Sequence, residues 1–452
     1  MDQSNRYDVC IIGAGIAGAS MAVYLGNNGF RVALFERNWN SSEDIVGELL
    51  QPGGVKMLQD LRLYSVLENI DAQHIEGYAM FLNGEFQKLS YPNDDHKHPS
   101  GFGFRYGKLI RNLRKLAEEN SNVDCVEASV QGLSMEDSGN VNGVVYKADN
   151  NETAALESRI TIVSQGSLSS LRKGLNKAKT DIKGYMLGLV LEDAELPFES
   201  HGHVIMADPA PVLVYPVGSG KVRVLIDFPK EEKVLKGDAL ESYLLDHIKP
   251  QLPEILQQKF EEAVFRGGFK MKPTCLLASR PVLKSNVILL GDSLNMRHPT
   301  TGGGMTVALT DVKALGDRLI EIGDLDNSYS VRRSVAEFYK KRHESNATVN
   351  ILAFALYSVF RHKVLRKACF DYLKRGGRFS AGPMSILSGV SRSRWTLFKH
   401  FFAVAGFAIL HQEKKRSWVS DVKGSITLLS DAVKIIFPLI RDEMPKTYKQ
   451  DF

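Results

Sequence analysis

The first forty residues hold the pattern that most restricts the fold. The stretch YDVCIIGAGIAGASMAVYLGNNGFRVALFER, from Tyr7 to Arg37, predicts an apolar strand, a glycine turn, a helix and a second apolar strand. Its glycines have the G-x-G-x-x-G spacing, which permits a tight turn, close approach of backbone to a pyrophosphate, and close packing of helix on strand. Glu36 follows about 20 residues later, where an acid accepts the ribose hydroxyls of an adenosine. The stretch predicts a Rossmann-like α/β domain whose dinucleotide site contains Gly13, Gly15, Ile16, Ala17, Gly18, Glu36 and Arg37.

A second glycine-rich stretch, GDSLNMRHPTTGGGMTVAL, lies at the other end of the chain, from Gly291 to Leu309. It follows the apolar run NVILL, which is typical of a buried strand, so Asp292 is expected at the carboxyl end of that strand. The glycines then lead into apolar residues at helical spacing and are expected at a helix N-terminus, where free N–H groups favour an electron-rich ligand.

An adenine dinucleotide can be NAD or FAD, and the second stretch favours FAD. FAD is extended and needs contacts to its ribityl chain and its ring, whereas a hydride dehydrogenase has little use for a late Gly-Asp. We expect Asp292, after Gly291, to bind the ribityl hydroxyls. The helix start is expected to bind the pyrimidine edge of the flavin, which becomes negative on reduction. That start comprises Gly302, Gly303, Gly304 and Met305.

The pairing of these two motifs resembles the para-hydroxybenzoate hydroxylase-like FAD monooxygenases. Four stretches more narrowly resemble the squalene monooxygenase (squalene epoxidase) family, in order and over nearly the whole chain. They are GELLQPGG (47–54), DAQHIEGY (71–78), NMRHPTTGGGMTVAL (295–309) and LRKACFDYLKRGG (365–377).

The resemblance implies an enzyme that epoxidises squalene to (3S)-2,3-oxidosqualene, in sterol or triterpenoid synthesis, with O2 and electrons derived from NADPH. It implies that Arg114 contacts FAD and that Tyr78 and Gln51 meet near the flavin ring as the catalytic pair. Because the chain has no second strand, glycine turn and helix with a ribose acid, the electrons are expected from an NADPH-dependent flavoprotein reductase, as in the eukaryotic family.

Two positions depart from the family pattern. Gln165 stands where the hydroxylases have an aspartate, and Asp44 stands where many relatives have an arginine. An amide can hydrogen-bond a hydroxyl but is not a fixed anion. Two alternatives therefore stay open: a hydroxylase of another terpenoid or aromatic, and a catalytically inactive flavin-fold protein that binds lipid.

The alternation of sequence character predicts interleaved domains. Residues 1–70, 106–182 and 273–345 are expected to form the FAD-binding domain, and residues 71–105 and 183–272 an antiparallel-sheet substrate domain. The period-two runs HVIMA, PVLVYPV and KVRVLIDF, with a turn at residues 218–220, predict that sheet. Residues 346–452 are expected to form a helical, membrane-associated region.

The membrane expectation rests on three apolar runs in this last third, NILAFALYSVFRH, HFFAVAGFAIL and SITLLSDAVKIIFPLI, which basic tracts separate. Each run is shorter than the roughly 20 residues that a spanning helix needs, so the runs suit helices lying in one leaflet. The alternative is a helical subdomain packed on the core. The resemblance implies monotopic attachment to the cytosolic face of the endoplasmic reticulum, here through the C-terminal part because no signal or anchor is expected from the N-terminal residues.

Charge and cysteine content exclude other classes. The net charge is +5, and the basic residues form no aromatic-interleaved stripe, so a nucleic-acid partner is not expected. The four cysteines lie far apart without metal-ligand spacing, so reduced thiols and no metal site are expected.

Overall fold

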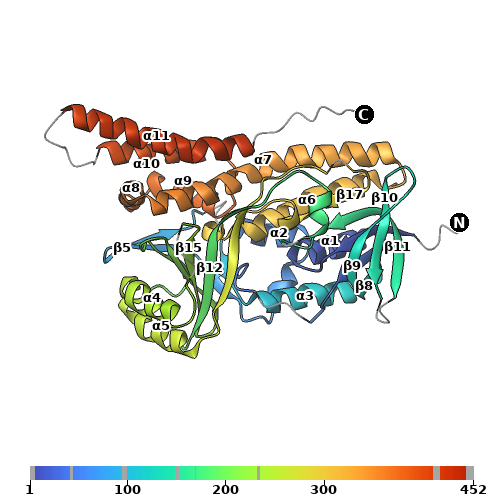
Figure 1. The fold of residues 1–452 in the computed structure, drawn as a ribbon, viewed down its shortest axis with the longest axis horizontal. Coiled ribbons are helices and arrows are strands. Elements are labelled where there is room, and N and C mark those ends of the chain that lie inside the picture. The colour runs from blue at the N-terminus through green and yellow to red at the C-terminus, as the bar shows by residue number, and fades with distance from the viewer. Residues whose placement is uncertain are drawn as a thin grey trace.

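The computed structural model describes residues 6–40, 44–93, 99–148, 152–167, 169–231, 235–282, 284–410 and 418–443. The chain forms two lobes, each built on a seven-stranded sheet, with a layer of helices from the C-terminal part along one side (Figure 1). We call them the dinucleotide lobe, which contains α1, and the sheet lobe, which contains β12 and β15.

The sheet of the dinucleotide lobe has five parallel strands, because its buried apolar runs are joined by crossovers rather than hairpins. Across the sheet these strands are β8 (Val123–Glu127), β2 (Val32–Glu36), β1 (Tyr7–Ile12), β11 (Thr153–Val163) and β17 (Val287–Leu289). The first part of β11 continues into an antiparallel extension with β10 (Val141–Lys147) and β9 (Ser129–Met135). The predicted strand–turn–helix–strand unit is confirmed as β1, α1 (Ile16–Gly26) and β2.

The period-two runs form antiparallel strands of the sheet lobe, as predicted, and these strands are buried on both faces. The strand order of the sheet is β16 (Lys270–Leu276), β12 (Asp181–Glu192), β15 (Lys221–Pro229), β14 (Val212–Gly218), β13 (His201–Ile205), β5 (Gly77–Leu82) and β6 (Glu85–Ser90). All neighbours are antiparallel except β13 and β5. One face packs against α4 (Asp238–Tyr243) and α5 (Glu254–Arg266) in an apolar core. The other face is turned towards the dinucleotide lobe and the C-terminal helices.

Smaller elements join the lobes. A three-stranded sheet consists of β3 (Leu49–Leu50), β7 (Gly101–Gly103) and β4 (Gln73–Ile75). The dinucleotide lobe also contains α2 (Pro52–Asp60), α3 (Tyr106–Glu118) and α6 (Gly304–Ile322). Short helical turns occupy Tyr64–Leu67, Leu171–Gly174, Leu244–Ile248, Lys249–Gln251, Gly291–Ser293 and Pro299–Thr301. The helix predicted after the glycine triplet is therefore confirmed as α6.

The C-terminal part is helical, as predicted. It contains α7 (Ser328–Arg361), α8 (Lys363–Lys374), α9 (Arg378–Leu387), α10 (Arg394–Leu410) and α11 (Trp418–Asp442), which gather along one side of the molecule in Figure 1. The first apolar run, in the second half of α7, is protein core rather than a lipid-facing surface, because Phe354, Tyr357 and Phe360 are at most 5% exposed. Within the described ranges, no helix combines the length and the apolar character needed to cross a membrane.

Candidate active site

A cavity of about 510 Å3 lies between the two lobes and is lined from both. The dinucleotide lobe contributes the first glycine turn, the ends of β2 and β11, and the stretch from Gly291 to Ala308. The sheet lobe contributes residues of β5, β12, β13, β14 and β15. A volume in this range is typical of small-molecule and cofactor sites.

The three glycines of the N-terminal motif have different roles. Gly13 has a φ of +102°, and a Cβ there would lie 2.7 Å from the carbonyl oxygen of Ser164. At Gly18 a Cβ would lie 1.9 Å from the carbonyl oxygen of Gly13, so this glycine lets α1 pack on the turn. Only at Gly15 is there room, with the Tyr106 hydroxyl oxygen 3.7 Å away. Gly13 and Gly15 line the cavity, whereas Gly18 packs behind the turn.

The N-terminus of α1 faces the cavity through Ile16 and Ala17 and has no side-chain cap. At the end of β2, Glu36 Oε2 accepts a hydrogen bond of 2.9 Å from the Ala14 amide. Arg114 of α3 lies 3.5 Å from the same carboxylate and donates to the Ala14 carbonyl at 3.1 Å. Arg114 therefore fixes the turn and the acid together, and both it and the exposed Arg37 line the cavity.

The second glycine stretch reaches the cavity from the opposite side. Asp292 follows β17 and is exposed to the cavity, yet the surrounding protein raises the pKa of its carboxyl group, while Arg297 and Lys272 oppose this rise. The N-terminus of α6 has no side-chain cap, and Gly302, with a φ of +60°, lies beside it.

The remaining predicted residues of this stretch differ in whether they line the cavity. Gly291, Gly304 and Met305 line the cavity. Gly303 is turned away, because a Cβ there would lie 2.6 Å from Cγ1 of Val349 in α7.

The two departures from the family pattern both lie at the cavity. The Gln165 amide oxygen accepts a hydrogen bond of 2.9 Å from the Ser169 hydroxyl. Asp44 forms an ion pair with Lys272 and accepts a hydrogen bond of 2.6 Å from the Ile45 amide. Both side chains therefore have partners in the protein itself.

Gln51 and Tyr78 are in direct contact, with 2.6 Å between Gln51 Nε2 and the Tyr78 hydroxyl oxygen. Gln51 Nε2 also donates to the Thr301 carbonyl at 2.7 Å, and its Oε1 accepts from the Tyr91 hydroxyl at 2.6 Å. All three side chains are buried. Burial raises the pKa of Tyr78 to about 12, against the smaller effects of hydrogen bonds with Gln51 and Tyr91, so the phenol stays protonated.

Tyr78 also marks the apolar part of the cavity. It projects from β5 against Gly202 of β13, where a Cβ would lie 2.8 Å from its ring. Further apolar wall residues come from β3, β12, β14, β15 and the loop after β17: Leu49, Met186, Leu213, Leu225 and Met296. One end of the cavity is therefore polar and the other apolar.

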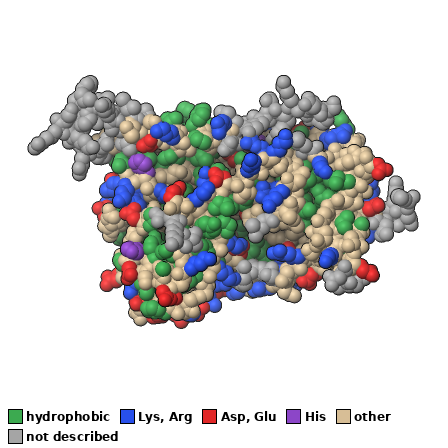
Figure 2. Space-filling model, in the orientation of Figure 1, with side chains coloured by type: hydrophobic (Ala, Val, Ile, Leu, Met, Phe, Trp, Pro, Cys, Tyr) green, Lys and Arg blue, Asp and Glu red, His purple; other side chains and the backbone are tan. Residues whose placement is uncertain are grey.

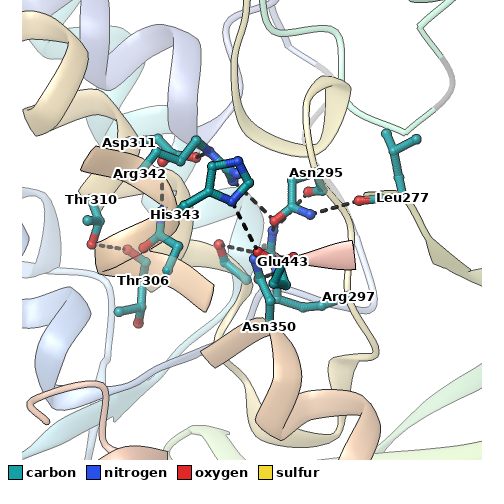
Figure 3. Close-up of polar contacts among 12 residues, drawn as sticks. Leu277, Asn295, Arg297, Thr306, Thr310, Asp311, Arg342, His343, Asn350 and Glu443 are labelled. Atoms are coloured by element: carbon teal, nitrogen blue, oxygen red, sulfur yellow. Dashed lines mark hydrogen bonds and ion pairs between the residues drawn. The ribbon is translucent and has the colours of Figure 1, made fainter. Parts of the chain in front are cut away.

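A charge cluster of half-buried Arg297 with the buried side chains of Asp311, Arg342 and Glu443 supports the second glycine stretch from behind (Figure 3). Arg297 donates to the carbonyl of Gly304 at 3.3 Å and to that of Asn295 at 2.8 Å, so it braces the chain leading into α6. Burial lowers the pKa of Arg297, and nearby Asp292 counteracts this.

The same cluster connects the C-terminal helices to α6 and to the second glycine stretch. Arg342 of α7 pairs with Asp311 of α6 at 3.0 Å and donates to Asn295 Oδ1 at 3.1 Å. Glu443, directly after α11, accepts a hydrogen bond of 3.1 Å from Asn350 of α7 (Figure 3). The end of the chain's last described helix is therefore anchored close to the cavity wall.

These groups fit FAD. Two uncapped helix N-termini present N–H donors to one cavity, as anionic groups such as a pyrophosphate require. A cavity-facing carboxylate suits the hydroxyls of a ribityl chain, and Glu36 suits those of a ribose. The space at Gly15 permits close approach of a ligand to backbone.

Several cavity residues were not predicted from the sequence. Tyr91 completes the contacts of Gln51, and Met186, Leu213 and Leu225 form the wall. His298 and Thr300 lie within a stretch quoted for its resemblance, but nothing in the spacing indicates their contacts with the sheet lobe.

Comparisons with known proteins extend this picture. The family model "SE: Squalene epoxidase" matches residues 157–426, and the model "FAD dependent oxidoreductase" matches residues 8–47. The chain is 40% identical to Squalene epoxidase 3 of Arabidopsis thaliana over 450 residues, covering 96% of this chain and 84% of the relative. It is 36% identical to Squalene monooxygenase of Mus musculus over 454 residues, covering 97% and 78%.

Solved structures resemble most of the architecture. PqsL, a probable FAD-dependent monooxygenase from Pseudomonas aeruginosa, matches with a TM-score of 0.61 at 20% identity, covering 85% of this chain and 99% of that chain. The flavin-dependent brominase Bmp2 matches with a TM-score of 0.69 at 15% identity, covering 89% and 99%. At these identities the likeness concerns the fold, and it confirms the predicted α/β fold class.

Proposed function

The chain belongs to the squalene epoxidase family, and on this premise we propose that its cavity is the site of an FAD-dependent epoxidation of squalene in sterol biosynthesis. The overall reaction converts squalene, O2, two electrons and two protons into 2,3-oxidosqualene and water. The observation that carries the proposal is the single cavity that joins two helix N-termini of the dinucleotide lobe to an apolar wall of the sheet lobe.

We assign the polar part of this cavity to FAD. The turn at Gly13 and Gly15, with Ile16 and Ala17, would hold the pyrophosphate, and Glu36 the adenosine ribose. Asp292 and the start of α6 would hold the ribityl chain and the flavin ring. When bound, FAD supplies the electrons that activate O2 for oxygen transfer.

The protein's own residues would exclude water from the cavity and hold the cavity wall in position. Met186, Leu213 and Leu225 offer squalene an apolar surface and exclude water, which limits the loss of reducing equivalents to hydrogen peroxide. Tyr78 accepts a hydrogen bond from Gln51, so its ring is held at the cavity wall. The high pKa of Tyr78 favours a role in positioning rather than as a base.

Tyr78→Phe tests that assignment, because it removes the hydroxyl and keeps the ring. We expect the variant to retain FAD and flavin reduction but to form less epoxide and more hydrogen peroxide for each NADPH used. Tyr372→Phe is the matched control, since its hydroxyl bonds His400 among the C-terminal helices. Wild-type coupling in Tyr78→Phe would show that the hydroxyl only supports packing.

The electrons would come from a separate NADPH-dependent flavoprotein reductase. The sequence contains one G-x-G-x-x-G unit with its following strand and acid, and we assign that unit to FAD. The prediction is that NADPH alone reduces the bound flavin slowly and that adding a reductase accelerates the reduction at least tenfold. Equal rates in both cases would indicate that NADPH binds this chain directly.

The protein would associate with the cytosolic face of the endoplasmic reticulum through α10 and α11. Trp395 and Leu410 of α10 are 78% and 80% exposed, and Phe437 of α11 is 59% exposed. Exposed aromatic and aliphatic side chains at the surface of such helices suit insertion into one leaflet. Elsewhere Lys and Arg are scattered among other side chains on the face drawn in Figure 2.

Membrane attachment is best tested by substitution, because Phe407 and Glu443 are buried and a truncation would open the core. Trp395→Ser with Phe437→Ser should shift the protein from sedimenting vesicles into the supernatant while FAD stays bound. Tyr329→Ser, at an exposed aromatic residue far along α7 from these helices, is the control. Unchanged sedimentation of the double variant would assign membrane contact to another surface.

The enzymatic proposal is tested with purified protein, FAD, a reductase, NADPH and squalene. Oxidosqualene that carries one atom from 18O2 is the expected product. Hydroxylation of another terpenoid or aromatic, without epoxide, would favour the alternative hydroxylase. Purification without FAD, and no binding of added FAD, would favour a lipid-binding protein without this chemistry.

A further inference from the structure

Asp44 places a carboxylate at the cavity wall, at a position where many relatives have an arginine. Its Oδ1 accepts hydrogen bonds from the backbone amides of Ile45 at 2.6 Å and Val46 at 3.3 Å. Its Oδ2 is paired with the ammonium group of Lys272. The carboxylate is therefore held on one side by its own loop and on the other by a cation from β16 of the sheet lobe.

Lys272 brings a positive charge to the cavity from the sheet lobe. Among the described residues that line the cavity, it is the only Lys or Arg from that lobe. The dinucleotide lobe contributes Arg37, Arg114 and Arg297 to the lining. Arg114 is paired with Glu36, and Arg297 donates to backbone carbonyls of its own stretch. The sheet-lobe side of the cavity therefore depends on Lys272 for a cation.

The Asp44–Lys272 pair contributes little to the stability of the fold. The side chains of Lys272 and Asp44 are 47% and 22% exposed. Such exposed pairs are weak, because water screens the two charges and because ordering a lysine side chain costs conformational entropy. Since both side chains line the cavity, their position favours a role towards a ligand.

The pair lies between the two parts of the cavity that we assign to FAD. Tyr106 is one neighbour, and its hydroxyl lies beside the first glycine turn. Burial raises the pKa of Tyr106, and the negative charges of Asp44 and Asp292 raise it further. The surrounding protein also raises the pKa of Asp292, whereas Arg297 and Lys272 lower it. Asp44 and Lys272 are therefore near both the turn assigned to the pyrophosphate and the acid assigned to the ribityl chain.

The charge of FAD makes a cation necessary at this place. The diphosphate is anionic, and the cavity wall already contains the carboxylates of Glu36, Asp44 and Asp292. Like charges at close range oppose binding unless cations offset them. An ammonium group offers several N–H donors, so Lys272 can keep its pair with Asp44 and still donate to a phosphate oxygen.

We propose that Lys272, held by Asp44, binds the diphosphate of FAD from the sheet lobe and supplies the cation that position 44 lacks in this chain. The proposal rests on the assignment of the cavity to FAD made above. Asp44 then marks a positive charge that has moved to another position, rather than a loss of flavin binding. The cofactor is consequently held by side chains of both lobes.

The first test measures FAD binding by the full chain, without turnover. Lys272→Met removes the charge and keeps an unbranched side chain. It should raise the dissociation constant of FAD about tenfold or more, as expected when a charged hydrogen bond is lost. It should also make that constant less sensitive to NaCl, because salt screens the lost interaction. Lys270→Met is the matched control, since this exposed lysine of the same strand lines a separate, smaller pocket. An unchanged dissociation constant in Lys272→Met would overturn the proposal.

Moving the cation distinguishes cofactor binding from a contact that only joins the lobes. Asp44→Arg combined with Lys272→Met places the positive charge at position 44 and abolishes the ion pair. This double variant should bind FAD within about threefold of the wild type, because a guanidinium also binds phosphate. A double variant that binds FAD no better than Lys272→Met would overturn the proposal. Circular dichroism checks the folding of each variant, and Lys272→Gln replaces Lys272→Met if the latter does not fold.

ADP locates the contact within the cofactor. It contains the diphosphate and the adenosine of FAD but neither the ribityl chain nor the flavin. Lys272→Met should weaken the competition of ADP with FAD by the same factor by which it weakens FAD binding. A dissociation constant for ADP equal to that of the wild type would overturn the assignment to the diphosphate.

These outcomes are distinguishable from a failure of the proposed function. Tight and equal binding of FAD by the wild type and Lys272→Met would overturn the role of Lys272 alone. A wild-type protein that shows the expected differences in FAD binding, but forms no epoxide from squalene, would support the role of Lys272 and contradict the epoxidase proposal.

Discussion

The buried Arg342–Asp311 pair joins α7 to α6, and its removal gives a quantitative test of how the C-terminal helices are attached. Arg342 Nε lies 3.0 Å from Asp311 Oδ2, and both side chains are at most 1% exposed. Asp311 also accepts a hydrogen bond of 2.7 Å from Asn346. The perturbations are Arg342→Met, Asp311→Asn and the two together.

The magnitudes follow from burial. Breaking a buried ion pair by removing one partner costs about 3–5 kcal/mol, because the other charge stays unpaired. The double variant removes both charges of this pair, and the amide introduced by Asp311→Asn would keep an oxygen for the Asn346 side chain. The double variant should therefore lose about 1–3 kcal/mol less free energy of unfolding than the two single variants lose in sum. Lys313 and Asp317 form a partly exposed pair on the same helix, 2.6 Å apart, whose loss should cost about 1 kcal/mol or less.

Urea unfolding of the purified proteins, followed by fluorescence and by FAD release, measures these differences. Because Arg342 also donates to Asn295 near the cavity wall, Arg342→Met should release FAD at lower urea concentration than the Lys313→Met control. Two results would refute the reasoning. One is a double variant whose loss of unfolding free energy equals the sum of the two single losses. The other is single variants that are as stable as the Lys313 and Asp317 surface variants.

Further predictions concern the cavity and the buried histidines. Gly18→Ala should abolish FAD binding, because its Cβ would lie 1.9 Å from a backbone oxygen. Gly15→Ala should weaken FAD binding while the apoprotein still folds, because there is room for a Cβ at Gly15. FAD titration measures the binding of each variant, and circular dichroism measures its folding. Asp292→Asn should weaken FAD binding by about 1.5–3 kcal/mol through loss of a charged acceptor, and an unchanged dissociation constant in equilibrium dialysis would contradict its assignment. Burial lowers the pKa of His203 and His343 to about 4. Between pH 6.5 and 4 the unfolded chain therefore binds more protons than the folded protein does. The free energy of unfolding should fall as the pH falls through this window. His203→Gln should flatten that dependence in urea titrations at several pH values.

Local patterns predicted the parts of the site that lie within one stretch of chain. The turn at Gly13 and the start of α6 after Gly302 each need a strand, glycines and a helix in succession, and all three are visible in the sequence. The contact of Gln51 with Tyr78 was expected only from family resemblance. Gln51 follows β3 and Tyr78 lies in β5, which belongs to a different sheet, and no periodicity of the sequence predicts such a contact.

Contacts between distant segments were beyond these patterns. Asp227 and Tyr357 meet His298 because β15 and α7 pack against the loop before α6, and nothing local in either segment marks this. The apolar run in α7 was wrongly expected to face lipid. Periodicity shows that a helix face is apolar but does not show whether protein or lipid covers it, and here Phe354 and Phe360 pack in the core.

The interleaving of the two sheets has a consequence for how the chain acquires its structure during synthesis. Strand β5 pairs with β13, joining Gly77 to His201, and β1 pairs with β11, joining Tyr7 to Ser158. The sheet lobe is incomplete until β16 ends at Leu276, and the dinucleotide sheet until β17 ends at Leu289. Such high contact order slows folding and leaves strand edges unpaired on the nascent chain, where they invite aggregation. We therefore expect neither lobe to fold as an excised fragment, and yields of the whole protein to depend on chaperones that hold the first 289 residues until both sheets can close.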